Sequence, residues 1–236
     1  MKSTKMPGVI AFSCLVLGLA ISAPATTISF STGDNSTVDG GKPVDAQVTF
    51  VTTTNEILVT LENLQTKISD IAQVISGVSF ELSNNKTSTT LGSSSGVERT
   101  VNSNRTFSDG LTVPTGWQVL LDGTSMQLML PDGMDTHSII GPASGTKYSN
   151  ANSSIAGSSD ANPFLAGPVT FVIPVNGVTS TTTVDWATFH FGICATYVQA
   201  CNTFVPEPGS MTLVGLAIAC GAVAGRRKLR SLRRKA

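Results

Sequence analysis

Ionisable side chains are scarce in this 236-residue chain: 13% of its residues are charged and only two are histidines. A zinc site usually takes four ligands at tight spacing, so two histidines and four cysteines leave little from which to build one. The chain also has neither an EF-hand spacing nor a repeated calcium-binding nonapeptide. Calcium could still bind loop carboxylates, which are Asp34, Asp39, Asp122, Asp132 and Asp135. Turns favour aspartate for local hydrogen bonding, however, so these residues have an ordinary explanation. We therefore predict no metal and no cofactor.

The N-terminus has the three parts of a secretory signal peptide. Two lysines precede an uncharged apolar run at residues 9–21, and a small-x-small site follows at Ala23 and Ala25. The run is too short for a permanent anchor and ends at a cleavage site. Cleavage after Ala25 is favoured, because cleavage after Ala23 would leave a proline first. We predict that residues 1–25 are removed on export.

The C-terminus combines a rigid motif, an apolar run and a cluster of cations. Pro206-Glu207-Pro208 disfavours a helix, and residues 211–225 carry no charge. The last eleven residues contain seven cations, which are Arg226, Arg227, Lys228, Arg230, Arg233, Arg234 and Lys235. Such cations hold the basic end of a membrane segment in the cytoplasm. A helix of this run would rise about 23 Å, short of a hydrocarbon core of about 30 Å, so we predict a marginal transmembrane helix.

These three parts, in this order, resemble the PEP-CTERM sorting signal of Gram-negative bacteria. The resemblance implies recognition and processing by exosortase, a membrane-embedded enzyme of cells that make exopolysaccharide. The chain would then be an inner-membrane intermediate on its way to the cell surface or extracellular matrix. A plain tail anchor would not need Pro206-Glu207-Pro208, and a basic tail that binds nucleic acid would not need the apolar run. We therefore assign residues 205–236 to the sorting signal.

Between the two signals, residues 26–204 form one predicted exported domain. It contains six basic and fourteen acidic residues, a net charge of −8. Nucleic-acid binding depends on cations that neutralise phosphates. An acidic domain is therefore not expected to bind nucleic acid.

The domain alternates apolar and polar residues over short stretches, the pattern of half-buried strands. We predict a mainly β fold: a single antiparallel β-sandwich of jelly-roll type. One short helix is expected from Ser69, as its N-cap, to Gly77. Residues 139–165 are too long and polar for a hairpin loop and should pack across one end of the sandwich as an ordered loop. The predicted strands are residues 44–52, 57–64, 78–82, 117–121, 125–130, 169–173 and 182–191.

Several stretches of the domain also resemble PEP-CTERM cargo proteins of unassigned function. They include IIGP, YSNANSSIAG and NPF in the long loop, and ATFHFG at residues 187–192. This second resemblance implies no activity and supplies no catalytic residue.

Two cysteines fall within the exported domain, Cys194 and Cys201, and the export route is oxidising. We predict that they form a disulfide. A metal pair completed by His190 is the alternative.

Candidate catalytic and binding residues have more ordinary explanations. Residues 92–96 (GSSSG) fit the Gly-x-Ser-x-Gly pattern, but polar turn residues flank them, and the sequence places neither His137 nor His190 beside them. We predict a non-enzymatic surface or matrix protein. A carbohydrate-binding module for exopolysaccharide is the runner-up, because Trp117, Trp186 and Tyr148 could line a sugar platform, although strand tryptophans are usually core. A secreted hydrolase ranks third.

Overall fold

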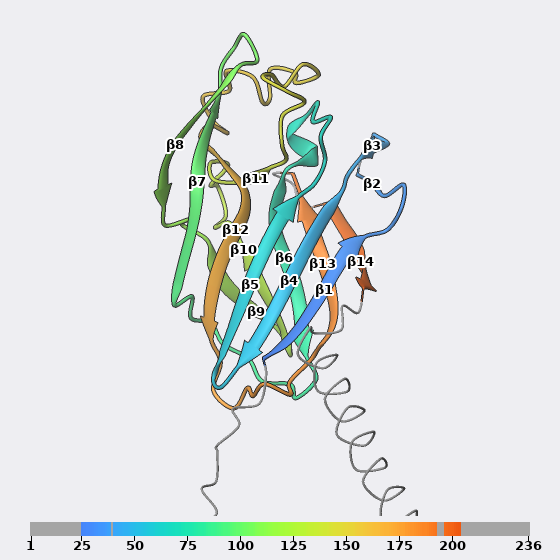
Figure 1. Ribbon diagram of the computed structural model, residues 1–236, viewed down its shortest axis with the longest axis vertical. Helices are drawn as coiled ribbons and strands as arrows, with labels where there is room; N and C mark the ends of the chain where they lie inside the picture. The colour runs from blue at the N-terminus through green and yellow to red at the C-terminus, as the bar shows by residue number, and fades with distance from the viewer. Residues whose placement is uncertain (1–24, 39, 193–195, 204–236) are drawn as a thin grey trace, which may run out of the picture.

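Antiparallel strands make up almost all of the regular structure in the computed structural model, which describes residues 25–38, 40–192 and 196–203 (Figure 1). The strands are β1 (Thr26–Thr32), β2 (Thr37–Val38), β3 (Lys42–Pro43), β4 (Ala46–Thr53), β5 (Glu56–Asn63), β6 (Ile75–Leu82), β7 (Ser93–Val101), β8 (Phe107–Val113), β9 (Gln118–Asp122), β10 (Ser125–Met129), β11 (Ile139–Ile140), β12 (Phe164–Pro174), β13 (Val184–Phe191) and β14 (Thr196–Thr203). Within these ranges no helix is long and apolar enough to cross a bilayer. The predicted transmembrane helix, and all of the predicted signal peptide except Ala25, lie outside them.

One strand path runs through both layers of a sandwich-like fold. Its order is β8-β7-β12-β5-β4-β1-β14-β13-β6-β10-β9. Antiparallel pairing of β1 with β14 joins the layers, and β11 links them again by pairing with β12 and β6. The prediction of a mainly β sandwich is therefore confirmed at this level. We call the pairing of β1 with β14 the β1–β14 seam. The jelly-roll prediction did not include a sheet that continues from one layer to the other across this seam.

Alternation of apolar and polar residues places β4 and β5 with one face in the core. Every second residue of each strand is buried, and the two pair in register from Ala46 with Asn63 to Thr53 with Glu56. The turn between them contains Asn55 at a φ of 60°. Asparagine tolerates this left-handed conformation better than most residues. Both strands therefore lie within one or two residues of where the alternating pattern predicts them.

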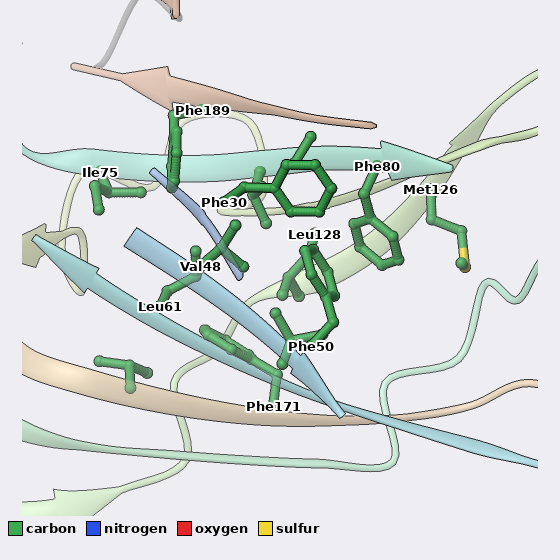
Figure 2. Close-up of a cluster of buried hydrophobic side chains, with 14 of the residues drawn as sticks. Phe30, Val48, Phe50, Leu61, Ile75, Phe80, Met126, Leu128, Phe171 and Phe189 are labelled. Atoms are coloured by element: carbon green, nitrogen blue, oxygen red, sulfur yellow. The ribbon is translucent and has the colours of Figure 1, made fainter. Parts of the chain in front are cut away.

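Phenylalanines from both layers fill the space between them (Figure 2). Phe50 of β4 meets Phe80 of β6 with ring centroids 4.8 Å apart, and Phe30 of β1 packs edge-on against Phe50 at 6.0 Å. Trp117 and Phe171 form a tilted pair with ring centroids 5.0 Å apart. Burying such side chains contributes about 1.5–3 kcal/mol each, so contacts between the layers are a main source of stability.

The predicted helix is shorter than expected. Ile71–Gln73 forms a single 3-10 turn, and its N-cap is Asp70 rather than Ser69. The continuation predicted through Gly77 is wrong, because residues from Ile75 onward belong to β6. There Ile75 pairs with Phe191 and Gly77 with His190 of β13. Strand pairing across the sheet overrides the weak helical signal of two isoleucines four residues apart.

The long loop predicted at residues 139–165 is ordered and lies across the upper end of the sandwich in Figure 1. It begins with β11 and leads into β12, and between them it inserts buried side chains into a second core. That core comprises Ile68, Val74, Val101, Ile140, Tyr148, Ala151, Ile155, Ala161 and Phe164. The expectation of an ordered end-packing loop is confirmed.

Candidate functional site

A polar hollow of about 450 Å³ lies on the outward face of the layer that contains β6, β9, β10 and β13. Strand alternation explains its composition: Val78, Phe80 and Leu82 of β6 are buried in the core, so Ser79 and Glu81 face outward. The same alternation in β10 turns Ser125 and Gln127 outward. The lining residues are Ser79, Glu81, Asp122, Thr124, Ser125, Gln127, Trp186, Thr188 and His190.

An irregularity in β13 places its tryptophan in the hollow. Val184 pairs with Leu82, but Trp186 pairs with Glu81, so Asp185 is an extra residue on β13. Such bulges redirect side chains and often occur beside functional sites. The half-buried Trp186 donates a hydrogen bond from Nε1 to Glu81 Oε2 at 2.9 Å. The bulge and this bond together fix the indole ring against β6.

Glu81 is a fixed acceptor at the side of the hollow. Its Oε1 accepts a hydrogen bond from Thr124 Oγ1 at 2.5 Å, in addition to the bond from Trp186. These two bonds, the one from Thr124 first, lower the pKa of the Glu81 carboxyl below its ordinary value of 4.5. At neutral pH the side chain is therefore a carboxylate whose orientation is set by donors on two other elements.

His190 and Ser79 form the buried floor of the hollow. His190 is 1% exposed, and its Nε2 lies 2.8 Å from Ser79 Oγ. Burial lowers the pKa of His190 to about 4, so the imidazole is neutral at pH 7. Gly77 makes room for it, because a Cβ there would lie 3.2 Å from His190 Nδ1 and 2.9 Å from Met129 Cβ. Trp186, Thr188 and His190, at every second position of β13, thus all line the hollow, with His190 at its floor.

The Gly-x-Ser-x-Gly pattern opens strand β7 and is not at a strand-to-helix turn. Ser94 Oγ accepts a hydrogen bond from Thr115 Oγ1 at 2.8 Å. His137 has a φ of 66° and contacts the Thr115 carbonyl oxygen at 3.0 Å and Glu98 Oε1 at 3.1 Å. The nearest link between Ser94 and His137 thus runs through Thr115, which is not the direct contact that a nucleophile and its base require.

Two of the three aromatic residues considered for a sugar platform belong to the core. Trp117 is 5% exposed and donates from Nε1 to the His137 carbonyl oxygen. Tyr148 is 2% exposed, donates to the Gly141 carbonyl oxygen and accepts from Arg99. Burial, the largest influence, raises the pKa of Tyr148. Of these three, Trp186 alone reaches the hollow.

The residues considered for a metal or a disulfide are only partly described. The described residues contain no group of three or more histidine, cysteine or carboxylate side chains able to hold a metal; Asp122 lines the hollow, and Asp39 is not described. Cys194 lies outside the described residues, and the side chain of Cys201 is not described. The disulfide stays a prediction, as does cleavage after Ala25.

The sequence analysis considered Trp186 for a sugar platform, His190 for a metal pair and Asp122 as a loop carboxylate. It missed Ser79, Glu81, Ser125 and Gln127, although the alternating positions of their strands carried a signal. What no local pattern could show is that β6, β10 and β13 are neighbours.

Comparison with known proteins gives one match. A family model described as the PEP-CTERM protein-sorting motif matches residues 204–228. The match covers the predicted Pro206, Glu207 and Pro208 and extends through Arg226, Arg227 and Lys228, with Arg230 just beyond it. Neither the curated proteins nor the solved structures provide a match. The chain therefore carries a PEP-CTERM sorting motif, consistent with an exosortase substrate, and the motif assigns no function to the domain before it.

Proposed function

We propose that this protein is a non-enzymatic cargo of the exosortase pathway, with a structural or interaction role at the surface or in the extracellular matrix of a Gram-negative bacterium. The observation that supports it is the PEP-CTERM motif at residues 204–228. In this proposal the tail holds the exported chain briefly in the inner membrane. Exosortase then separates the domain from the tail near Pro206-Glu207-Pro208.

The position of the last strand supports this route. β14 ends at Thr203, so the matched motif follows the folded domain directly. Three Cα–Cα steps separate Thr203 from Pro206, and a chain of that length spans at most about 11 Å. Because β1 and β14 are antiparallel neighbours, β1 begins at the end of the sandwich toward which β14 runs. Both signals would therefore attach to one end of the domain, and the loop at residues 141–163 lies at the other (Figure 1).

The test replaces Pro206, Glu207 and Pro208 with Ala, Gln and Ala, which leaves the apolar run and the cations unchanged. We expect the wild type to reach the surface without its tail, whereas the variant stays full-length in the inner membrane. Mass spectrometry of each cell fraction measures whether residues 226–236 are retained.

A matched control changes three residues beyond the matched motif, Leu229, Ser231 and Leu232, to alanine and keeps every cation. This control should be processed like the wild type. If the wild type and the Pro206-Glu207-Pro208 variant both retain the tail and fractionate alike, the segment is only an anchor and the proposal is wrong.

A second candidate function is binding of exopolysaccharide. One observation favours it: the hollow on the outer sheet face combines a half-buried tryptophan with hydrogen-bonding side chains. Sites for small polar ligands commonly combine an aromatic surface with a few oriented polar groups. This function is compatible with delivery to the matrix.

A further inference from the structure

We propose that the hollow formed by β6, β10, β13 and the β9–β10 turn binds a segment of an uncharged polysaccharide, with Trp186 as its packing surface and Glu81 as its fixed acceptor. The proposal deepens the second candidate function and depends on it. It does not depend on how exosortase processes the tail.

The charge of the lining selects against anionic ligands. Glu81 and Asp122 supply two carboxylates, and none of the lining residues in the described part of the chain is a lysine or an arginine. The neutral imidazole of His190 adds no positive charge at pH 7. Phosphates, nucleic acids and acidic polysaccharides would meet the negative charge of these carboxylates, and a like charge at a binding surface is unfavourable.

The polarity of the lining selects against apolar ligands. Apart from the Trp186 ring, the lining side chains end in hydroxyl, amide, carboxylate or imidazole groups. A lipid or an apolar peptide would leave these groups without partners, which costs binding free energy. No group of metal-binding side chains occurs here among the described residues. A ligand rich in uncharged hydroxyls, which both donate and accept hydrogen bonds, is the class that remains.

The hollow has the size and the rigidity of a binding site. Its volume of about 450 Å³ falls within the range of about 300–1,000 Å³ that ligand pockets occupy. Trp186 is held by Glu81, Glu81 is held by Thr124, and Ser79 is held against His190. These bonds orient the side chains before a ligand arrives, which reduces the entropic cost of binding.

The shape of the tryptophan surface suits a sugar ring. An indole has a flat apolar face and one polar edge, and here the polar Nε1–H is already bonded to Glu81. The ring is therefore available to pack against the C–H groups of a sugar. Nearby, Gln127 and Thr188 supply an amide and a hydroxyl for its hydroxyl groups.

The experiment uses the full-length exported chain, purified in a detergent without a sugar headgroup. The probe is the extracellular polysaccharide of the producing culture, separated by anion exchange into neutral and acidic fractions. Affinity electrophoresis and titration calorimetry measure binding of the wild type and of Trp186→Ala, Trp186→Phe and Glu81→Gln. Leu111→Ala is the matched control, because Leu111 is 78% exposed on β8 in the other layer.

We expect the wild type and Leu111→Ala to bind the neutral fraction equally. Trp186→Ala should weaken binding about tenfold or more, as truncation of a central tryptophan does at interfaces. Trp186→Phe, which keeps a ring but loses the bond to Glu81, should bind with intermediate affinity. Glu81→Gln, nearly identical in shape, should weaken binding by removing the charged acceptor, and a thermal unfolding midpoint for each variant verifies that it is folded.

Two results overturn the proposal, and they are distinguishable. If the wild type binds neither fraction, or binds only the acidic one, the ligand class is wrong and the carbohydrate-binding function fails in the form proposed. If the neutral fraction binds the wild type and the folded Trp186 and Glu81 variants equally, the function stands and the binding site lies elsewhere.

Discussion

Burial of His190 should make the folded protein less stable as the pH falls from 7 to 5. The pKa of His190 is about 4 in the fold, whereas a histidine in an unfolded chain has a pKa of about 6.5. At pH values between these two, the imidazole of His190 is protonated in the unfolded chain and neutral in the folded protein. Wherever the unfolded state binds more protons than the folded state, stability decreases as the pH decreases. The stability contributed by the neutral His190 is therefore fully present above about pH 6.5 and is lost as the pH falls toward 4.

The size of the effect follows from the two pKa values. A pKa difference of about 2.5 units lowers the free energy of unfolding by roughly 3 kcal/mol at a pH well below 4. At pH 5 the linkage relation gives a loss of about 2 kcal/mol. The carboxyls of Asp70, Glu81 and Asp109 have lowered pKa values from ordinary values of 3.8, 4.5 and 3.8. Their stabilising contributions are lost mostly below about pH 4.5, so pH 5 separates them from His190.

The assay is urea unfolding at pH 7 and pH 5 of the wild type and of His190→Gln, followed by intrinsic fluorescence. Glutamine does not titrate and can still bond to Ser79. Between pH 7 and pH 5 the free energy of unfolding of the wild type should fall by about 2 kcal/mol more than that of the variant. The contributions of titrating groups common to both proteins cancel in this difference. If the two proteins lose equal stability, the buried histidine does not resist protonation and the reasoning fails.

Three further predictions concern the ion pair between β7 and β8, the export site and the cysteines. Arg99 donates two hydrogen bonds to Asp109, at 2.6 and 2.8 Å, and lies over the Phe107 ring. Arg99→Met should therefore lower the free energy of unfolding, measured with urea, by about 1–3 kcal/mol. An unchanged urea midpoint would contradict this prediction. N-terminal sequencing of the exported protein should begin at Thr26, whereas an intact Met1 would show that no signal peptide is removed. Thiol labelling of the folded protein without reductant should leave Cys194 and Cys201 unmodified; labelling of both would exclude the bridge.

Strands with a local apolar pattern could be predicted from the sequence, whereas exposed strands such as β8 could not. β4 and β5 each bury every second residue, so their patterns predict both location and orientation. β8 is exposed along most of its length, with Leu111 outward at an edge of the sheet. β7 begins with serines and pairs with β12. Neither edge exposure nor pairing with a distant strand leaves a local hydrophobic pattern.

The candidate site follows the same division. Alternation in residues 184–191 predicts that Trp186 and His190 share a face. The register that brings Trp186 opposite Glu81, however, depends on a single extra residue, Asp185, within the pairing of β13 and β6. A register shift of one residue turns a side chain to the other face. The composition of the hollow was therefore readable strand by strand, but its assembly depends on non-local pairing.

The β1–β14 seam connects the fold to the export route. β1 begins at Thr26, directly after the predicted cleavage site, and β14 ends at Thr203, directly before the sorting motif. The pairs from Ser29 with Thr203 to Thr32 with Ala200 join the first and last strands of the domain. The sheet is therefore complete only when residues 26–203 have all reached the same side of the membrane. Processing at Pro206-Glu207-Pro208 would then release a domain whose two layers are already joined, because every residue of the seam precedes the motif.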